Sequence, residues 1–195
     1  MPNTEYSNFK ELEKNEVGNY TIECIDKGSH IIIIAPHGGR IEPRTDTIAK
    51  TIAYQNFNYY GFISERGKIK ARKNMHITSH KFDEPKALEL VGKSEIVIAI
   101  HGCKNLHSQR SNKKEIFIGG LNKDLKTKLE KVLKESSLHV SFLRKFAGEE
   151  EDNICNRGST KAGVQFELTS SFRNDGELCR IFISTVRNFL ETNAL

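Results

Sequence analysis

The sequence predicts an α/β protein, a three-layer sandwich whose helices cover both faces of a mixed, mostly parallel sheet. Two segments carry this prediction: His30–Pro36 reads HIIIIAP and Glu95–Ile100 reads EIVIAI. Unbroken apolar runs of this length are typical of strands buried on both faces of a parallel sheet. Helical patterns alternate with the strands, as in layered α/β domains. We expect one domain over residues 1–195, because this length suits a single core.

The other elements follow in chain order. Residues 1–20 are predicted to be a polar N-terminal arm with a short helix at Phe9–Lys14. Shorter strands are expected at Tyr59–Ser64, Glu115–Ile118, His139–Phe142 and Val164–Leu168. Helices are expected at Thr45–Gln55, Glu84–Val91, Asn122–Glu135 and Gly176–Phe189, where apolar residues recur at helical spacing. Pro85 in a first turn and Asn122 as an N-cap mark two helix starts.

Composition excludes several protein classes. Apolar residues make up 37% of the chain and charged residues 28%, which is too much apolar material for a disordered chain. No apolar run approaches the ~18 residues of a membrane-spanning helix, and the polar N-terminus lacks the apolar core of a signal peptide. We therefore expect a cytoplasmic protein with no membrane partner. The four cysteines form no C-x-x-C pair, which argues against a zinc ribbon or a thioredoxin-type site.

The segment Pro36–Pro43, PHGGRIEP, follows the first buried strand and holds the first candidate metal ligands. His37 and Glu42 are five positions apart, a spacing that puts them on different faces of either a helix or a strand. They can converge only through an irregular loop, and Gly38 and Gly39 supply the conformational freedom for one. An imidazole and a carboxylate brought together in this way are good zinc ligands.

His101 ends the second buried strand, in the segment IAIHGC. Parallel sheets place their ligands beyond the carboxyl ends of the strands, so His37 and His101 are expected at one edge, with Glu42 on the loop after the first strand. Three protein ligands with a fourth position open to water are typical of a catalytic zinc site. Each histidine taken alone also fits a surface or hydrogen-bonding role.

Glu167 lies in the alternating segment GVQFELT, where Val164, Phe166 and Leu168 form the apolar face. Glu167 points away from that face, near the end of its strand, and a carboxylate there could serve as the general base for a zinc-activated water. The same pattern fits the solvated face of an edge strand. Cys103 and His101 also form a conceivable nucleophilic pair, although no separate base is evident.

Basic and polar residues near these motifs are candidates for substrate binding. Guanidinium groups suit the capture of carboxylates, which makes Arg40, Arg157 and Arg173 candidates, with Asn156 beside Arg157 and His80 as a further polar candidate. Each of these side chains also fits an ordinary surface position.

Five segments, taken together, resemble a known family: PHGGRIEP, ITSHKFDEP (Ile77–Pro85), IAIHGC, NICNRG (Asn153–Gly158) and GVQFELT followed by Arg173. They are similar to motifs of the phage-type poly-γ-glutamate hydrolases, whose bacterial relatives have carried the label phage-related replication protein. The resemblance spans about residues 31–173. It implies a zinc-dependent peptidase with a carboxypeptidase-like α/β core that cleaves γ-glutamyl amide bonds. By this resemblance His37, Glu42 and His101 hold one zinc ion and Glu167 is the general base.

One departure limits what can be carried over. Metallocarboxypeptidases space their first two ligands as H-x-x-E, whereas this chain has H-x-x-x-x-E, and Asn156–Arg157 comes after His101 instead of before it. The substrate-binding role of the corresponding arginine in those enzymes therefore does not transfer to Arg157.

The formal net charge of +5 suits an anionic partner such as poly-γ-glutamate, to which Arg40, Arg157, Arg173 and the loop Lys68–Lys73 could contribute. A competing hypothesis is a metal-free nucleic-acid-binding phage accessory protein, but Gly67–Asn74, GKIKARKN, has no aromatic residue for base stacking. A third is an amidase for a small N-acyl amino acid or a cell-wall γ-glutamyl bond. We expect a monomer, released on host lysis if a phage encodes it.

Overall fold

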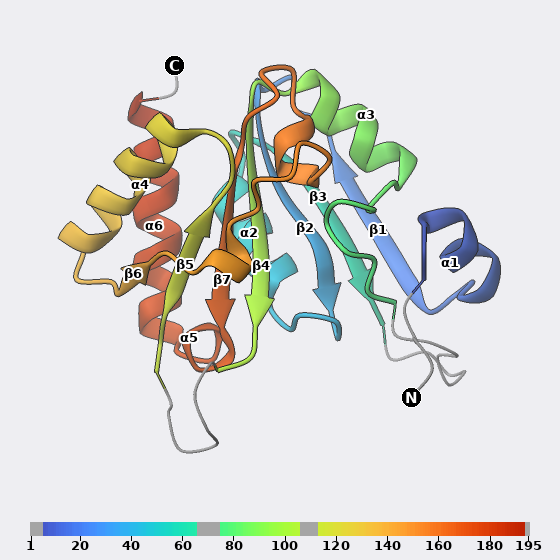
Figure 1. The fold of residues 1–195 in the computed structure, drawn as a ribbon, viewed down its shortest axis with the longest axis horizontal. Helices are drawn as coiled ribbons and strands as arrows, with labels where there is room; N and C mark the ends of the chain where they lie inside the picture. The colour runs from blue at the N-terminus through green and yellow to red at the C-terminus, as the bar shows by residue number, and fades with distance from the viewer. Residues whose placement is uncertain (1–5, 66–74, 106–112, 194–195) are drawn as a thin grey trace.

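The computed structural model describes residues 6–65, 75–105 and 113–193. Within them a single sheet has the strand order β1-β3-β2-β4-β7-β5-β6 (Figure 1). Four of its six pairings are parallel; β1 with β3 and β5 with β7 are antiparallel. The strands are β1 Tyr20–Ile25, β2 Ile31–Gly39, β3 Asn58–Ser64, β4 Ile96–Cys103, β5 Ile116–Gly119, β6 Val140–Ser141 and β7 Val164–Thr169. The predicted mixed, mostly parallel sheet is confirmed.

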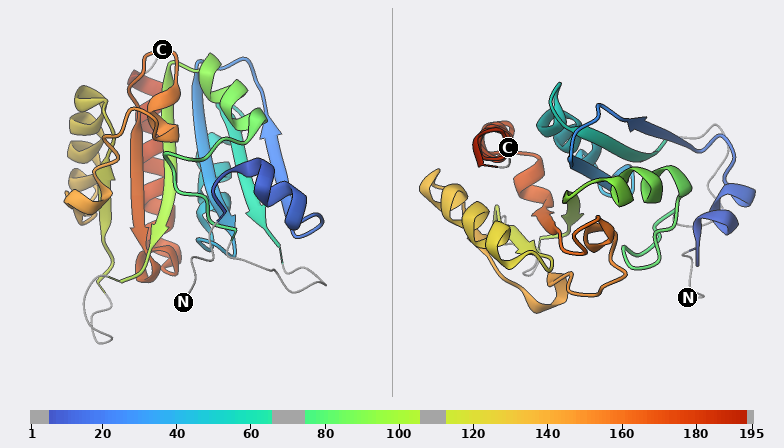
Figure 2. Two further views of the ribbon diagram at one scale, coloured as in Figure 1. Left: turned by 45° about the vertical axis from the view of Figure 1, so that its right-hand side comes forward. Right: turned by 90° about the horizontal axis from the view of Figure 1, so that it is seen from above.

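Helices pack on both faces of the sheet, which gives the three predicted layers (Figure 2). One apolar core lies between the sheet and α2, α4 and α6, and the other lies between the sheet and α1, α3 and the 3-10 helix η2. The helices are α1 Phe9–Asn15, α2 Thr45–Ala53, α3 Pro85–Lys93, α4 Lys123–Glu135, α5 Ser170–Arg173 and α6 Gly176–Asn193, with η1 Arg144–Phe146 and η2 Ile154–Arg157. No helix in the described part of the chain has both the length and the apolar character of a membrane span.

Helix capping follows the local sequence. Pro85 occupies the first turn of α3, and the preceding Glu84 caps that helix by accepting a hydrogen bond from the Ala87 N–H at 2.8 Å. Asn122 caps α4 by accepting from the Leu125 N–H at 3.0 Å. Both predicted helix starts are confirmed, because each depends only on contacts between near neighbours in the chain.

The N-terminal segment differs from the predicted polar arm. Tyr6, Phe9 and Leu12 are buried in the core beneath α1, so the described part of this segment packs on the sheet. The sequence analysis also missed β1, Tyr20–Ile25, which pairs with β3 at one edge of the sheet. Its residues are partly or fully exposed, so the strand lacks the apolar run that identified β2 and β4.

A bulge in β2 decides which face of the sheet receives His37. Between Ala35 and Gly38 the register with β3 shifts, so that Pro36 and His37 stand opposite Phe62 alone. Proline has no N–H to donate to a ladder and is found at such irregularities. Plain alternation would turn His37 to the same side as Ala35, toward α2; the extra residue turns it to the other face, where it contacts the segment between β3 and α3.

Candidate functional site

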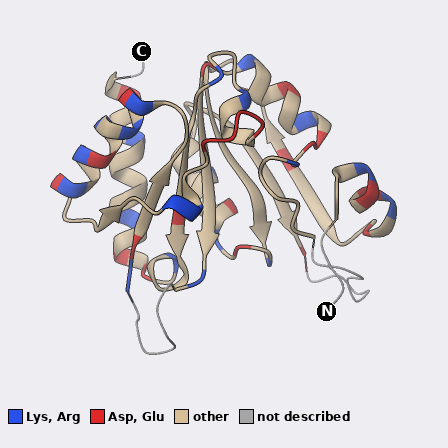
Figure 3. Cartoon of the chain, viewed as in Figure 1, with Lys and Arg blue, Asp and Glu red and all other residues tan. Residues whose placement is uncertain are grey.

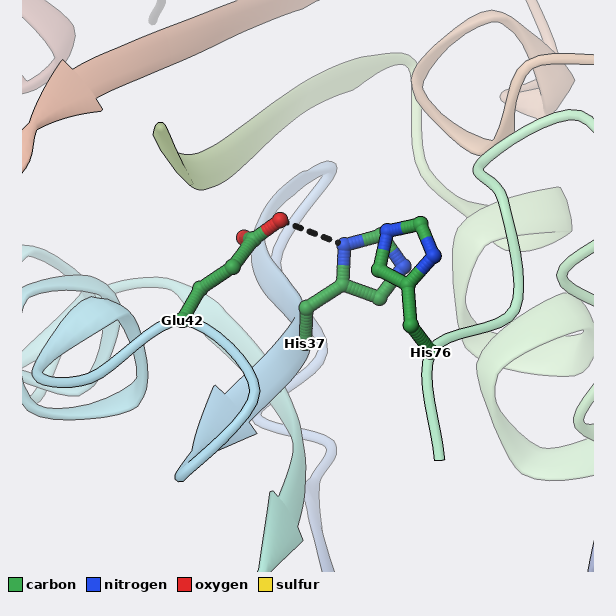
Figure 4. A group of neighbouring side chains, drawn as sticks. All are labelled: His37, Glu42 and His76. Atoms are coloured by element: carbon green, nitrogen blue, oxygen red, sulfur yellow. Dashed lines mark hydrogen bonds and ion pairs between the residues drawn. The ribbon is translucent and has the colours of Figure 1, made fainter. Parts of the chain in front are cut away.

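A closed turn brings the first two candidate ligands together. The backbone N–H of Glu42 donates to the His37 carbonyl at 2.8 Å, which closes the turn after β2. Within it Gly39 has φ +69°, and a Cβ there would lie 2.1 Å from the Ser64 carbonyl oxygen, so only glycine fits. The turn places Glu42 Oε1 3.1 Å from His37 Nδ1 (Figure 4). The predicted irregular loop with glycine at its bend is therefore present.

His101 joins this pair from the neighbouring strand, β4. Its Nδ1 lies 3.2 Å from His37 Nδ1 and 3.6 Å from Glu42 Oε2. The Gly102 N–H donates to Glu42 Oε2 at 2.8 Å, which fixes the carboxylate relative to β4. The structure thus brings together all three residues that the sequence suggested as metal ligands.

The outward nitrogens of both imidazoles are bonded elsewhere, so that their Nδ1 atoms face each other. His37 Nε2 lies 2.7 Å from the Ile77 carbonyl, which can only accept, and His101 Nε2 lies 3.4 Å from Ser79 Oγ. A neutral His37 therefore turns an Nδ1 lone pair toward the Glu42 carboxylate. Two acceptors this close need a cation between them, either a proton or a metal ion.

This donor set fits zinc. Two imidazoles and a carboxylate are common zinc ligands, and ligand atoms on one tetrahedral ion lie about 3.3 Å apart when each bond is about 2.0–2.1 Å. The two Nδ1 atoms are 3.2 Å apart, and the carboxylate of Glu42 approaches them with different oxygens, Oε1 at 3.1 Å from His37 and Oε2 at 3.6 Å from His101. Metal-binding histidines also typically donate their other ring N–H to a carbonyl, as His37 does to Ile77.

His76 is a fourth group at this site, and the sequence analysis did not identify it. It lies in an irregular segment before α3, and its ring centroid is 4.2 Å from that of His37 (Figure 4). His37, Glu42 and His76 each offer one possible ligand atom within 4.8 Å of the others. Burial, together with the charge of His37, lowers the pKa of His76 to about 4, which favours the neutral imidazole.

Glu167 faces the same cavity from β7, directly opposite His101 in the ladder between β4 and β7. The apolar residues of β7 face the other core, as the alternation predicted. However, β7 lies between β4 and β5, so the alternative interpretation of Glu167 as part of a solvated edge strand is wrong. Glu167 is partly buried beside the candidate ligands, within reach of whatever the cavity holds.

The charges of the site are strongly coupled. Burial favours a neutral Glu42, but the charge of His37 and hydrogen bonds from His101 and His37 outweigh it and hold the pKa of Glu42 well below its usual value. Burial likewise opposes charge on His101, yet Glu42 raises the pKa of its imidazole. Burial raises the pKa of Glu167 to about 7, although His101 pulls it down. A carboxyl group that titrates near neutral pH suits proton transfer.

Cys103 is not suited to nucleophilic catalysis at this site. Its side chain is buried, and burial together with the charge of Glu167 raises the pKa of its thiol to about 12. A thiol with that pKa is protonated at neutral pH and is a poor nucleophile. The geometry therefore does not favour the Cys103–His101 pair.

The site opens into a cavity of about 290 Å³. Of the residues proposed for substrate binding, His80 lines this cavity and is exposed. Arg40 is exposed and does not line it, and its backbone N–H donates to Ser64 on the neighbouring strand. The loop Lys68–Lys73 lies outside the described residues.

Asn156 and Arg157 are used to hold the chain together. The buried Asn156 amide donates to the carbonyls of Gly148 and Glu150 and accepts from two backbone N–H groups. The Arg157 guanidinium donates to the carbonyls of His80, Phe82 and Asp152 at 2.7–2.9 Å. Neither residue lines the cavity. The structure thus supports a structural role for both and does not favour direct contact with substrate.

Arg173 is buried beneath the site. Its guanidinium donates to the carbonyls of Leu168 at 3.0 Å, Cys103 at 3.2 Å and Pro43. These carbonyls belong to the three segments that carry Glu167, His101 and Glu42. Gly102 lies directly against the guanidinium, because a Cβ at that position would be 2.6 Å from Arg173 Cζ. Arg173 therefore ties the segments of the site to one another, a contact not expected from its place in the sequence.

The chain is similar in sequence and fold to several known proteins. The SPbeta prophage-derived UPF0714 protein YoqZ of Bacillus subtilis (strain 168) is 34% identical over 174 residues, which are 87% of this chain and 60% of YoqZ. The chain thus spans about three fifths of the length of that relative. A solved structure of YndL in a zinc-free apo form is 28% identical with a TM-score of 0.87, covering 97% of this chain and 98% of that one.

A solved bacteriophage poly-gamma-glutamate hydrolase is 25% identical with a TM-score of 0.84 and covers 95% of both chains. The family model described as poly-gamma-glutamate hydrolase matches residues 6–180 of this chain, a range that contains every candidate ligand and Glu167. The chain belongs to the poly-gamma-glutamate hydrolase family.

Proposed function

We propose that this protein is a zinc-dependent amidohydrolase that cleaves γ-glutamyl amide bonds in poly-γ-glutamate. The observation that carries the proposal is the convergence of His37 Nδ1, His101 Nδ1 and the Glu42 carboxylate, with Glu167 on the adjacent strand. The family and the bacteriophage hydrolase support the substrate. YndL, which has been solved in a zinc-free form, supports the choice of metal.

His37, Glu42 and His101 would hold the zinc ion, which supplies Lewis acidity toward a water molecule and a substrate carbonyl oxygen. The bonds from Ile77, Ser79 and Gly102 keep the three ligands oriented before any ion arrives. Such prior orientation lowers the cost of assembling the site.

Glu167 would move the proton. Its carboxylate accepts a proton from the attacking water, whose oxygen bonds to the carbonyl carbon of the γ-amide. As the C–N bond breaks, the Glu167 carboxyl group gives that proton to the leaving amine nitrogen. The products are a γ-carboxylate and a free amine. Burial raises the pKa of Glu167 to about 7 in the metal-free protein, which favours uptake of a proton, and a zinc ion in the cavity would lower that pKa.

The test is incubation of the zinc-loaded protein with poly-γ-glutamate, with product size read on a gel and a chelator as control. Glu167→Gln should keep about one zinc per chain by metal analysis but lose hydrolysis by at least about a hundredfold, the usual scale of a general base. The matched control is Glu149→Gln, which removes the same charge from an exposed residue that does not line the cavity.

Full activity of Glu167→Gln would remove Glu167 from the mechanism. Zinc-dependent hydrolysis of small N-acyl glutamates without cleavage of the polymer would favour the alternative amidase. Tight binding of nucleic acid by a metal-free protein without amidase activity would favour the accessory-protein hypothesis.

A further inference from the structure

Two cationic side chains of η1 line the cavity, and the sequence analysis did not select either. Arg144 and Lys145 both line the cavity that contains Glu167, and both are exposed. Figure 3 shows η1 as a short blue turn in front of the sheet beside β7. Among the described residues, neither side chain forms a hydrogen bond or an ion pair; the Lys145 ammonium lies 4.6 Å from the centre of the Phe146 ring.

The backbone that carries these two residues is firmly attached to the sheet. The Ala147 carbonyl accepts from the Gly120 N–H at 2.7 Å, and the Phe146 carbonyl accepts from Gln165 Nε2 at 3.1 Å. A Cβ at Gly119 would lie 2.4 Å from the Phe146 carbonyl oxygen, so η1 approaches β5 as closely as a backbone can. Gln165 is two residues from Glu167 on β7. The backbone that carries Arg144 and Lys145 is therefore fixed relative to the strand of Glu167.

The other arginines suggested for substrate binding are committed elsewhere. The guanidinium groups of Arg157 and Arg173 donate hydrogen bonds to backbone carbonyls. Arg40 does not line the cavity. Of the lysines and arginines that the structure describes, only Arg144 and Lys145 line the cavity. Glu42, Glu150 and Glu167 line it as well and would repel an anionic substrate, so Arg144 and Lys145 are the described side chains of the cavity that can attract one.

We propose that Arg144 and Lys145 form a subsite that binds the free α-carboxylates of the γ-glutamyl chain beside the scissile bond. This inference rests on the proposed function. Each γ-linked residue carries one α-carboxylate, and a guanidinium and an ammonium on adjacent residues can bind carboxylates of one chain. The subsite selects γ-linked polyanions over neutral amides.

The test compares two ligands, a γ-linked pentaglutamate and the same oligomer with its α-carboxylates converted to carboxamides. Calorimetry measures their binding to zinc-loaded Glu167→Gln protein with and without Arg144→Gln/Lys145→Gln. We expect the parent to prefer the charged oligomer, and the double change to lower that preference about threefold to tenfold, the scale of two partly exposed ion pairs. Lys131→Gln is the matched control, on α4 against the opposite face of the sheet.

In the active protein the double change should raise KM for poly-γ-glutamate by a similar factor and alter kcat less than twofold. The inference is overturned if the preference for the charged oligomer survives the double change, if Lys131→Gln lowers it equally, or if the parent shows no preference. Binding that follows the expected pattern in a protein that cleaves neither ligand would support the subsite and defeat the proposed hydrolysis.

Discussion

Arg173 shows at the scale of one residue how a buried cation can hold the segments of the candidate site together. Three backbone carbonyls surround its guanidinium, and they come from segments up to 130 positions away in sequence. Sequence proximity to Glu167 suggested a substrate role, but the destination of a guanidinium depends on tertiary contacts that no local pattern records. His76 was not identified for the same reason: it lies in a segment without periodicity, and only tertiary contacts bring it to the site.

We expect Arg173→Met to lower the free energy of unfolding by about 3 kcal/mol, because it leaves buried carbonyls without a donor. Urea unfolding measures the change. Arg40→Gln, at an exposed position, should change stability by less than about 0.5 kcal/mol. Equal urea midpoints for the two variants would show that the three contacts do not stabilise the fold.

Glu167 should make the metal-free protein less stable as the pH rises. Its pKa is raised from 4.5 to about 7 by folding, so between these values the folded state binds the proton and the unfolded state has released it. The unfolding free energy therefore falls across this window, by up to about 3 kcal/mol, and levels off above pH 7. Urea titrations from pH 4 to 8 with chelator should show that the unfolding free energy of Glu167→Gln rises relative to that of the parent over this range. A constant difference would contradict the raised pKa.

At the scale of elements, the bulge in β2 and the turn after it decide whether His37 and Glu42 can meet. The sequence predicted the strand from its isoleucines and the turn from its glycines, but it did not reveal the bulge that changes the face of His37. Bulges depend on the pairing of two strands, and β3 begins at Asn58, 16 residues after the turn closes at Glu42. Strand existence is local information, whereas register is not.

The turn gives a prediction at this scale. Gly39→Ala should lower the unfolding free energy by at least about 2 kcal/mol, because alanine disfavours φ +69° and its Cβ would collide with the Ser64 carbonyl. Gly92→Ala is the matched control, since a Cβ there meets no atom within 4 Å inside α3 and alanine favours a helix by about 0.5–1 kcal/mol. Denaturant unfolding should show that the unfolding free energy falls for Gly39→Ala and rises for Gly92→Ala. Changes of the same sign in the two variants would contradict the steric argument.

On the scale of the whole molecule, the sheet was predictable where its strands are buried on both faces. The runs that form β2 and β4 are apolar throughout, and they predicted both the parallel sheet and the common edge for His37 and His101. The edge strand β1 could not be predicted, because an exposed edge strand has no such apolar run. The packing of α1 against the sheet could not be predicted either. The cavity wall from η1 was also missed, since Arg144 and Lys145 look in the sequence like any surface cations.

Zinc should bind the assembled fold and stabilise it, because its proposed ligands lie on β2, on the turn after it and on β4, and come together only in the folded chain. Zinc at a hundred times its dissociation constant would add about 2.7 kcal/mol to the unfolding free energy, a rise in Tm of about 5–10 °C at this chain length. Chelator should reverse the shift in a thermal melt.

The same melt decides which histidine is the third ligand. His101 Nδ1 lies 3.2 Å from His37 Nδ1 and 3.6 Å from Glu42 Oε2. The His76 ring is tilted by 40° against that of His37, and its possible ligand atom lies within 4.8 Å of those of His37 and Glu42. We therefore expect His101→Ala to abolish the zinc-dependent shift and His76→Ala to retain most of it, with His139→Ala, an exposed histidine outside the cavity, as the control. A shift that survives His101→Ala and disappears with His76→Ala would transfer the ligand role to His76 and leave His101 as a hydrogen-bonding residue of β4.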